Sequence, residues 1–88
     1  EVEEKFAKTG EDTYCVDCSV NMEDFMDFFD VKLDTDSISV GGWVMEQLHR
    51  LPVKGDTFTV NDLEITVSEL NAYRASYITV RQCDVNLA

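Results

Sequence analysis

Cys15 and Cys18 stand three residues apart near the start of the chain, the spacing found in thiol redox motifs and in zinc sites. Residues 13–18 alternate along the chain in the way typical of a half-buried strand. Because residues three apart in a strand point to opposite faces, the two sulfurs cannot meet unless the strand ends before Cys18. Redox motifs also place their first cysteine at a helix N-terminus. We therefore interpret these two residues, and Cys83, as ordinary reduced thiols of a cytosolic protein.

Carboxylates are frequent between residues 24 and 36. An EF-hand loop that starts at Asp34 is excluded, because it needs an oxygen ligand where Ile38 stands and a bidentate Glu where Met45 stands. Clustered carboxylates still attract hard cations, although a charged run is more often a solvated face. The candidate ligands for a divalent cation are Asp24, Asp27, Asp30, Asp34 and Asp36.

Two glycines fall in the first turn of a helix that Ser39 is expected to cap. Each glycine costs about 1 kcal/mol relative to alanine in a helix interior, and less near a helix end. We expect this loss to be offset either by close packing of another element or by exposed backbone amides that bind a ligand. Helix N-termini favour anions. The candidate site for an anion or nucleotide is therefore Ser39, Val40, Gly41 and Gly42.

The other polar residues form no catalytic set. His49 is the only histidine, which excludes a Ser-His-Asp triad and histidine-rich metal sites unless it acts alone. Its place at the end of a predicted helix suits the satisfaction of terminal carbonyls. Trp43, Tyr73 and Tyr77 have rings that stack on a base or flavin, but Trp43 belongs to a helix stripe facing the core. With no glycine-rich nucleotide motif, P-loop or nucleophile elbow, we predict that the protein is not an enzyme.

Two helices must position these residues. Asn21 is a good N-cap, and residues 22–29 carry apolar side chains at helical spacing, which predicts a short amphipathic helix. The second helix is expected to begin after Ser39 and to continue, with Leu51 on its apolar stripe, until Pro52 stops it.

Three alternating segments follow the second helix. Asn61 and Asp62 tolerate positive φ and are typical of a two-residue hairpin turn, and a second hairpin is expected through Asn71 to Arg74. One register buries a single face throughout, with these pairs: Val60 with Leu63, Phe58 with Ile65, Leu70 with Ala75, Val67 with Ile78, Ile65 with Val80 and Glu64 with Arg81. The predicted fold class is α+β: strand, helix, helix and a three-stranded antiparallel meander, with both helices on one small sheet.

Charge limits the partners. The chain of 88 residues has 18 acidic and 7 basic side chains and a net charge of −11. It would repel a phosphate backbone, so nucleic acid is not an expected partner, and it lacks the basic surface of a membrane-bound helix. Residues 1–40 hold 12 acidic and 3 basic residues, a net charge of −9, whereas residues 41–88 hold 6 and 4, a net charge of −2.

The run from Ser39 to Pro52, followed by Gly55-Asp56, resembles the signature of the CorC/HlyC transporter-associated domain. Residues 13–19 resemble the opening strand of that family, residues 25–33 its short helix and the aliphatic edge that follows, and residues 74–81 its closing strand. Two departures are Cys18, where Gly is common, and Asn61-Asp62 in place of the usual Asp-Gly turn. The resemblance covers nearly the whole chain.

This resemblance implies a C-terminal cytosolic module of a hemolysin-like or magnesium and cobalt efflux membrane protein. It implies a linker from a preceding CBS-type domain at residues 1–12, the transporter-associated domain at 13–82 and a tail at 83–88. The expected partners are the parent's other domains and a second copy, without membrane insertion of this part. The family fold is similar to one layer of FAD-binding domains of the vanillyl-alcohol-oxidase type. We expect no bound cofactor. FAD is the one cofactor that the fold resemblance suggests, although no residue here is suited to its covalent attachment.

Overall fold

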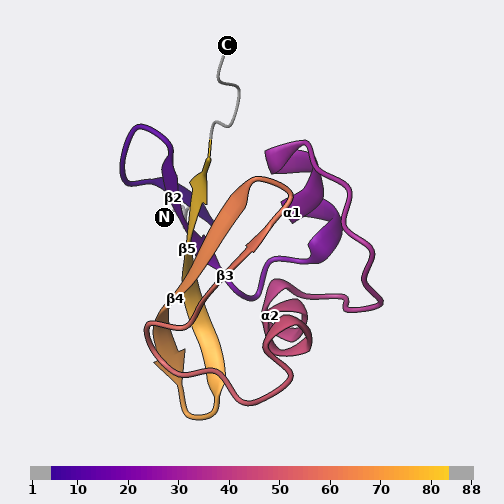
Figure 1. The fold of residues 1–88 in the computed structure, drawn as a ribbon, viewed down its shortest axis with the longest axis vertical. Coiled ribbons are helices and arrows are strands. Elements are labelled where there is room, and N and C mark those ends of the chain that lie inside the picture. The colour runs from indigo at the N-terminus through magenta and orange to yellow at the C-terminus, as the bar shows by residue number, and fades with distance from the viewer. Residues whose placement is uncertain (1–4, 84–88) are drawn as a thin grey trace.

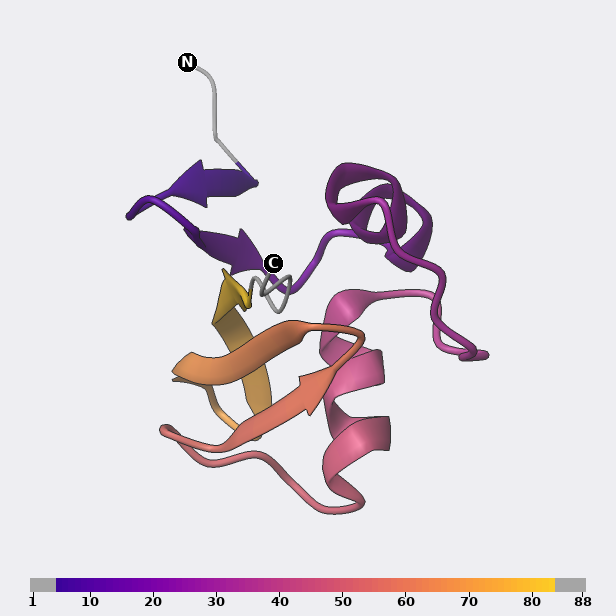
Figure 2. The same cartoon turned by 45° about the horizontal axis from the view of Figure 1, so that its top comes forward.

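The computed structural model describes residues 5–83, in which both predicted helices and all four predicted strands are present, together with one further strand. The elements are β1 (Phe6–Lys8), β2 (Thr13–Asp17), α1 (Met22–Phe29), α2 (Val40–Leu48), β3 (Thr57–Val60), β4 (Leu63–Asn71) and β5 (Arg74–Gln82). The strands form one antiparallel sheet in the order β1-β2-β5-β4-β3. Both helices cover the same face of this sheet (Figure 1 and Figure 2), as expected for the predicted α+β class.

The predicted pairs of the meander are all present, although the register between β4 and β5 shifts around Glu69, which pairs with Tyr77. Val60 pairs with Leu63, and Val67 pairs with Ile78. The turn between β3 and β4 uses Asn61 at φ 48° and so matches the hairpin type expected from the sequence. The remaining predicted pairs are also present: Phe58 with Ile65, Leu70 with Ala75, Ile65 with Val80, and Glu64 with Arg81, whose side chains lie 3.3 Å apart.

Helix α2 ends earlier than predicted. Its last residue is Leu48, and His49 adopts a left-handed conformation at φ 60° while its backbone N–H donates to the carbonyl of Met45. Leu51 therefore does not join the apolar stripe and is 56% exposed. The physical reason is that a residue at positive φ directs the chain away from the helix axis before the proline is reached. His49 ends the helix through its backbone, and a role of its imidazole in satisfying terminal carbonyls stays a prediction.

Strand β1 was not predicted, because three residues are too few to show a periodic pattern. It lies in residues 1–12, which the sequence suggested to be a linker, and it pairs with β2 through Phe6 opposite Val16. The ring of Phe6 stacks on Phe28 of α1 at 4.2 Å between centroids. The domain boundaries at residues 12/13 and 82/83 themselves stay a prediction.

The core lies between the sheet and the two helices. Its largest fully buried side chains are Trp43 and Phe25, whose ring centroids are 5.4 Å apart. On its other side Trp43 meets Phe58 of β3, also at 5.4 Å. Trp43 thus joins both helices to the meander, which confirms its interpretation as a core residue. In residues 5–83 no polar or charged side chain is buried.

Candidate functional site

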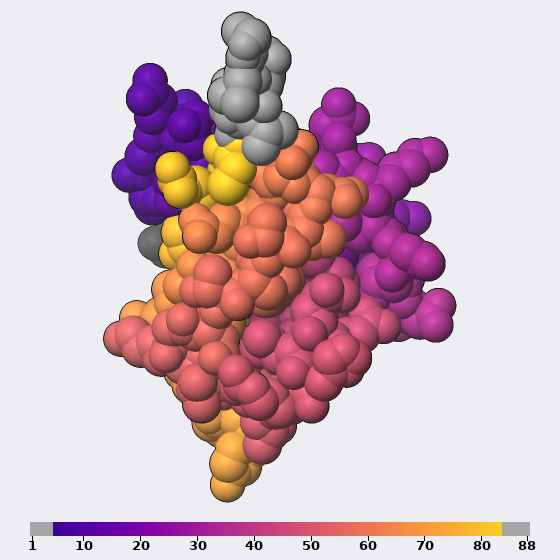
Figure 3. Space-filling model, in the orientation of Figure 1, coloured from indigo at the N-terminus to yellow at the C-terminus, as the bar shows by residue number. Residues whose placement is uncertain are grey.

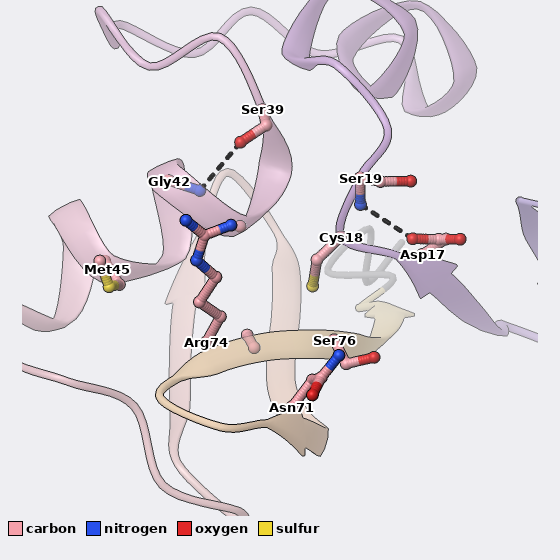
Figure 4. Close-up of a pocket in the computed structure, with 11 residues that line it drawn as sticks. Asp17, Cys18, Ser19, Ser39, Gly42, Met45, Asn71, Arg74 and Ser76 are labelled. Atoms are coloured by element: carbon pink, nitrogen blue, oxygen red, sulfur yellow. Dashed lines mark hydrogen bonds between the residues drawn. The ribbon is translucent and has the colours of Figure 1, made fainter.

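A cavity of about 620 Å³ lies where the start of α2 faces the end of β2 and the β4–β5 hairpin (Figure 4). This volume is within the range of about 300–1,000 Å³ that is usual for small-molecule sites. Three of the four residues predicted to bind an anion line it, namely Ser39, Gly41 and Gly42; Val40 is fully buried instead. The other lining residues are Asp17, Cys18, Ser19, Met45, Asn71, Arg74, Ala75 and Ser76.

The backbone amides at the start of α2 already have partners inside the protein. Val40 N–H donates to the carbonyl of Val20 at 2.9 Å, and Gly41 N–H donates to the carbonyl of Cys18 at 3.0 Å. Gly42 N–H donates to the Ser39 side-chain oxygen at 3.2 Å, which confirms the predicted cap. A phosphate would have to displace one of these bonds in order to bind the helix N-terminus. The first turn of α2 is thereby tied to the chain that leaves β2.

Close packing explains Gly41 better than ligand binding does. A β-carbon at this position would lie 3.4 Å from the carbonyl oxygen and 3.5 Å from the β-carbon of Cys18, and 3.7 Å from the carbonyl oxygen of Ala75. These are contact distances, so side-chain atoms beyond a β-carbon would press on the backbone of two strands. Gly42 meets only side-chain atoms of Ser37 and Ser39, the nearest at 3.5 Å. The two neighbouring glycines therefore occupy different environments.

Arg74 is the one basic side chain that lines the cavity. It projects from the start of β5 toward the first turn of α2 in Figure 4. Within residues 5–83 the ion pairs are Arg50 with Asp56 and Arg81 with Glu64, so Arg74 has no acidic partner in this part of the chain. Sequence reasoning placed it in a hairpin but missed its position here. Nothing in the local pattern shows that this hairpin lies beside the start of α2.

The two nearby cysteines are in different environments and remain free. Cys18 is 5% exposed at the floor of the cavity, and burial, aided by the negative charge of Asp17, raises the pKa of its thiol to about 12. Cys15 is half-buried and faces Thr79 across β2 and β5, and burial also raises the pKa of its thiol. Both thiols are protonated near neutral pH. Since the thiolate is the form that attacks disulfides and binds metals, this supports their interpretation as ordinary thiols.

The candidate carboxylates are spread along α1 and the connection to α2. Asp24 and Asp27 lie on the helix, Asp30 caps its C-terminus at φ 55°, and Asp34 and Asp36 follow in the connection. All five are exposed. Among residues 5–83, no three Asp, Glu, His or Cys side chains come close enough together to hold a metal ion. The structure thus does not gather these residues around one point.

A second, smaller groove of about 280 Å³ lies beside α1. Its lining is mixed, with the apolar residues Met22, Met26 and Ile38 and the polar residues Asn21, Glu23 and Ser37. Ile38 is 82% exposed, the highest value among the large apolar side chains of the described residues. Sequence reasoning did not identify this groove, since it forms only where the α1–α2 connection returns alongside the helix.

No helix among residues 5–83 is both long enough and apolar enough to cross a membrane.

Residues 7–83 match the CorC_HlyC family, described as a transporter associated domain. A putative Mg²⁺ and Co²⁺ transporter (CorC) associated region from Neisseria meningitidis MC58 is similar at a TM-score of 0.83 and 20% identity, covering 90% of this chain and 99% of that one. A hemolysin domain from Enterococcus faecalis V583 is similar at a TM-score of 0.85 and 20% identity, covering 92% of this chain and 100% of that one. A third similar structure is the CorC_HlyC domain of a Xylella fastidiosa Temecula1 hemolysin in complex with Mg²⁺ and Mn²⁺. Its TM-score is 0.82 and its identity 12%, and the match covers 92% of this chain and 100% of that one.

No curated protein matches the chain. The similarity to the solved structures, all three below 25% identity, shows a shared fold. The family match covers residues 7–83, and therefore most of the sequence. This chain belongs to the CorC_HlyC family of transporter associated domains.

Proposed function

We propose that the domain is a non-catalytic regulatory and interaction module of a hemolysin-like or divalent-cation (Mg/Co) efflux membrane protein, on the cytoplasmic side of the membrane. The family match over residues 7–83 carries this proposal. Further support comes from two solved structures of the same fold, one described as a CorC transporter associated region and the other as a hemolysin domain. The module acts by contact with the parent's other domains and with a second copy of itself.

The side chains favour a role in protein binding over a role in catalysis. In the described residues, every buried side-chain nitrogen and oxygen has a hydrogen-bond partner. His49 lies at an exposed helix end, and Cys15 and Cys18 are protonated. At the β4–β5 hairpin, by contrast, Tyr73 and Tyr77 are 75% and 38% exposed. Exposed tyrosines are enriched in protein interfaces, so this hairpin is our candidate surface for self-association.

The test is divalent-cation efflux by the full-length parent protein, with and without residues 1–88, in membranes that contain equal amounts of protein. We expect deletion to change either the transport rate or the assembly state. Unchanged transport together with unchanged assembly would remove the regulatory proposal. For the hairpin, Tyr73→Ala should weaken self-association in sedimentation equilibrium, whereas Leu51→Ala, which alters another exposed apolar residue, should not.

Nucleotide binding is a second candidate function, favoured by the volume of the α2 cavity and by Arg74 at its wall. FAD is the probe to use, because the family resemblance suggests a likeness to part of FAD-binding domains. A fluorescence titration that reaches high micromolar FAD should show a saturable change that Arg74→Ala reduces. A flat titration would exclude this candidate.

Divalent-cation sensing is a third candidate, supported by the Xylella fastidiosa domain whose structure contains Mg²⁺ and Mn²⁺. The carboxylates to test are Asp27, Asp30, Asp34 and Asp36. Calorimetry with magnesium, cobalt and calcium should give a saturable heat that neutralising these residues abolishes. No heat at millimolar ion would contradict it.

A further inference from the structure

We propose that the groove between α1 and the α1–α2 connection binds a basic amphipathic segment of a protein partner. We call it the α1 groove, defined by Asn21, Met22, Glu23, Met26, Ser37 and Ile38. This proposal rests on the proposed function as an interaction module, and it specifies the surface and the chemistry of the partner.

The first observation is an exposed aliphatic side chain, Ile38, in the lining of the groove. Ile38 directly precedes the N-cap of α2, where an apolar residue often packs back onto the helix. Here it does not pack, because its side chain is 82% exposed. Met26 also lines the groove and is half-buried, whereas Met22 is only 3% exposed and belongs to the core. Methionine is unbranched and adaptable, which suits a surface that receives varied apolar side chains.

The second observation is the size of the groove. Its volume of about 280 Å³ is less than half that of the α2 cavity. It also falls below the range of about 300–1,000 Å³ typical of small-molecule pockets. The groove has room for one or two apolar side chains of a larger partner, which favours a peptide over a small ligand.

The third observation is the acidic border on the α1 side. Glu23 lines the groove, and Asp27 and Asp30 follow it at intervals of four and three residues. Glu23 and Asp27 share one face of the helix, next to Met26, and Asp30 follows at the left-handed residue that ends α1. All three are exposed.

The opposite border is acidic too. Ser37 lines the groove, and its hydroxyl donates to the carboxylate of Glu46 at 3.3 Å. Thr35 donates to the same carboxylate, which holds Glu46 of α2 against the connection. Asp36 is exposed next to Ser37. Figure 3 shows side chains of the α1–α2 connection, coloured magenta, projecting from the edge of the molecule.

The arrangement of these charges selects the partner. Between residues 20 and 48 there are seven acidic residues and one basic residue, Lys32. A single metal ion needs ligands that converge, and in residues 5–83 no three such groups do so. Carboxylates spread along both sides of the α1 groove instead match lysines and arginines spread along a peptide. A partner helix or strand would insert apolar side chains between Ile38 and Met26 and direct its cations to the two borders.

The experiment measures binding of a fluorescein-labelled, lysine- and leucine-containing amphipathic helical peptide to the full 88-residue chain by fluorescence anisotropy. Comparison peptides are a scrambled one of equal composition without an apolar face, and one with every lysine replaced by glutamate. We expect saturable binding of the amphipathic peptide, at least about tenfold weaker binding of the scrambled peptide, and none of the acidic peptide. Binding should weaken as salt rises.

Two pairs of variants locate the site. The substitutions Glu23→Gln, Asp27→Asn and Asp30→Asn together should weaken binding at least about tenfold, whereas the same charge change elsewhere, through Glu11→Gln, Asp62→Asn and Glu69→Gln, should change it less than about threefold. Ile38→Ser should weaken binding, and Leu51→Ser, at another exposed aliphatic residue, should not. Far-ultraviolet circular dichroism checks that each variant is folded.

Equal losses in the two charge variants would overturn the proposal, because the net charge alone would then explain binding. The same conclusion follows if the scrambled peptide binds as well as the amphipathic one, or if millimolar Mg²⁺ displaces the peptide more than sodium of equal ionic strength. The proposed function fails separately: if deleting the domain leaves efflux and assembly unchanged while the peptide still binds the groove, the regulatory role is wrong and the groove stands.

Discussion

The cavity at the start of α2 and the α1 groove differ in the role of their polar groups. Around the start of α2, the backbone amides of Val40, Gly41 and Gly42 are bonded within the fold. Around α1, the carboxylates of residues such as Asp27 and Asp36 are exposed to solvent. Of the glycine pair that resembles the family signature, Gly41 thus serves packing of helix against strand, whereas the carboxylates of the acidic segment lie in solvent. The difference teaches that a recognisable family motif and the surface that we propose for a partner can be separate parts of one small domain.

The largest effect that we expect separates core from surface. Trp43 is 1% exposed and joins both helices to β3, so Trp43→Ala should lower the free energy of unfolding by about 3–5 kcal/mol. Ile38→Ala should change it by less than about 0.5 kcal/mol, because Ile38 is mostly in solvent. Urea denaturation measures the free energy of unfolding of both variants. It is followed by circular dichroism for both, and also by tryptophan fluorescence for Ile38→Ala. A loss above about 1 kcal/mol for Ile38→Ala would show that this residue supports the fold.

The two glycines of α2 provide a sharper comparison. Gly41→Val should cost about 1–3 kcal/mol, because atoms beyond the β-carbon press on the Cys18 and Ala75 carbonyls. Gly42→Ala should be neutral or stabilise by up to about 1 kcal/mol, since alanine favours the helix and only serine side chains are near. Thermal unfolding of both variants is the measurement. If Gly41→Val is tolerated as well as Gly42→Ala, close packing is not the reason for Gly41.

A smaller effect is expected at the cap of α2. Ser39→Ala removes the acceptor of the Gly42 N–H and should cost about 1 kcal/mol. Ser19→Ala changes another serine that lines the same cavity, and its exposed side chain should be replaceable with little loss. Chemical denaturation of the two variants side by side tests this. An equal loss in both would mean that the cap does not stabilise α2.

The smallest effect depends on pH. Hydrogen bonds from Arg50, at 2.8 and 2.7 Å, and from the Val53 N–H hold the pKa of Asp56 below its usual value. A carboxyl whose folded-state pKa is lowered adds stability above its unfolded pKa of 3.8 and loses it as the pH falls through the folded pKa.

The melting temperature of Asp56→Asn should therefore be lower than that of the parent chain near neutral pH, and the difference should shrink in acid. Melting curves at about pH 7 and about pH 2.5 measure it. A difference that grows in acid would contradict the role given to this ion pair.

Much of the fold could be predicted from the sequence because it is specified locally. The cap at Asn21 and the turn at Asn61 each need only a few neighbouring residues, and the register follows once the turn is placed. Strand β1 and the early end of α2 at His49 could not be predicted. The first is too short for a pattern, and the second depends on a left-handed residue that no sequence signal requires.

The candidate sites could be predicted only in part. Ser39 and Gly42 do line a cavity, but the presence of Arg74 there depends on how the β4–β5 hairpin packs against α2. The acidic residues were recognised as a group, whereas the groove beside them requires Ile38 to return next to α1, a contact between segments. Local pattern places residues in elements, and tertiary packing decides which of them share a surface.

One measurement tests directly whether the acidic segment, and not the α2 cavity, receives the partner. The ¹⁵N-labelled chain is titrated with the basic amphipathic peptide, and the amide chemical shifts are followed residue by residue. We predict that the largest shifts fall in residues 21–38 and at Glu46, with residues 39–42 and 71–76 little changed. Shifts concentrated around Gly41 and Arg74, or spread evenly over all acidic residues, would contradict this assignment.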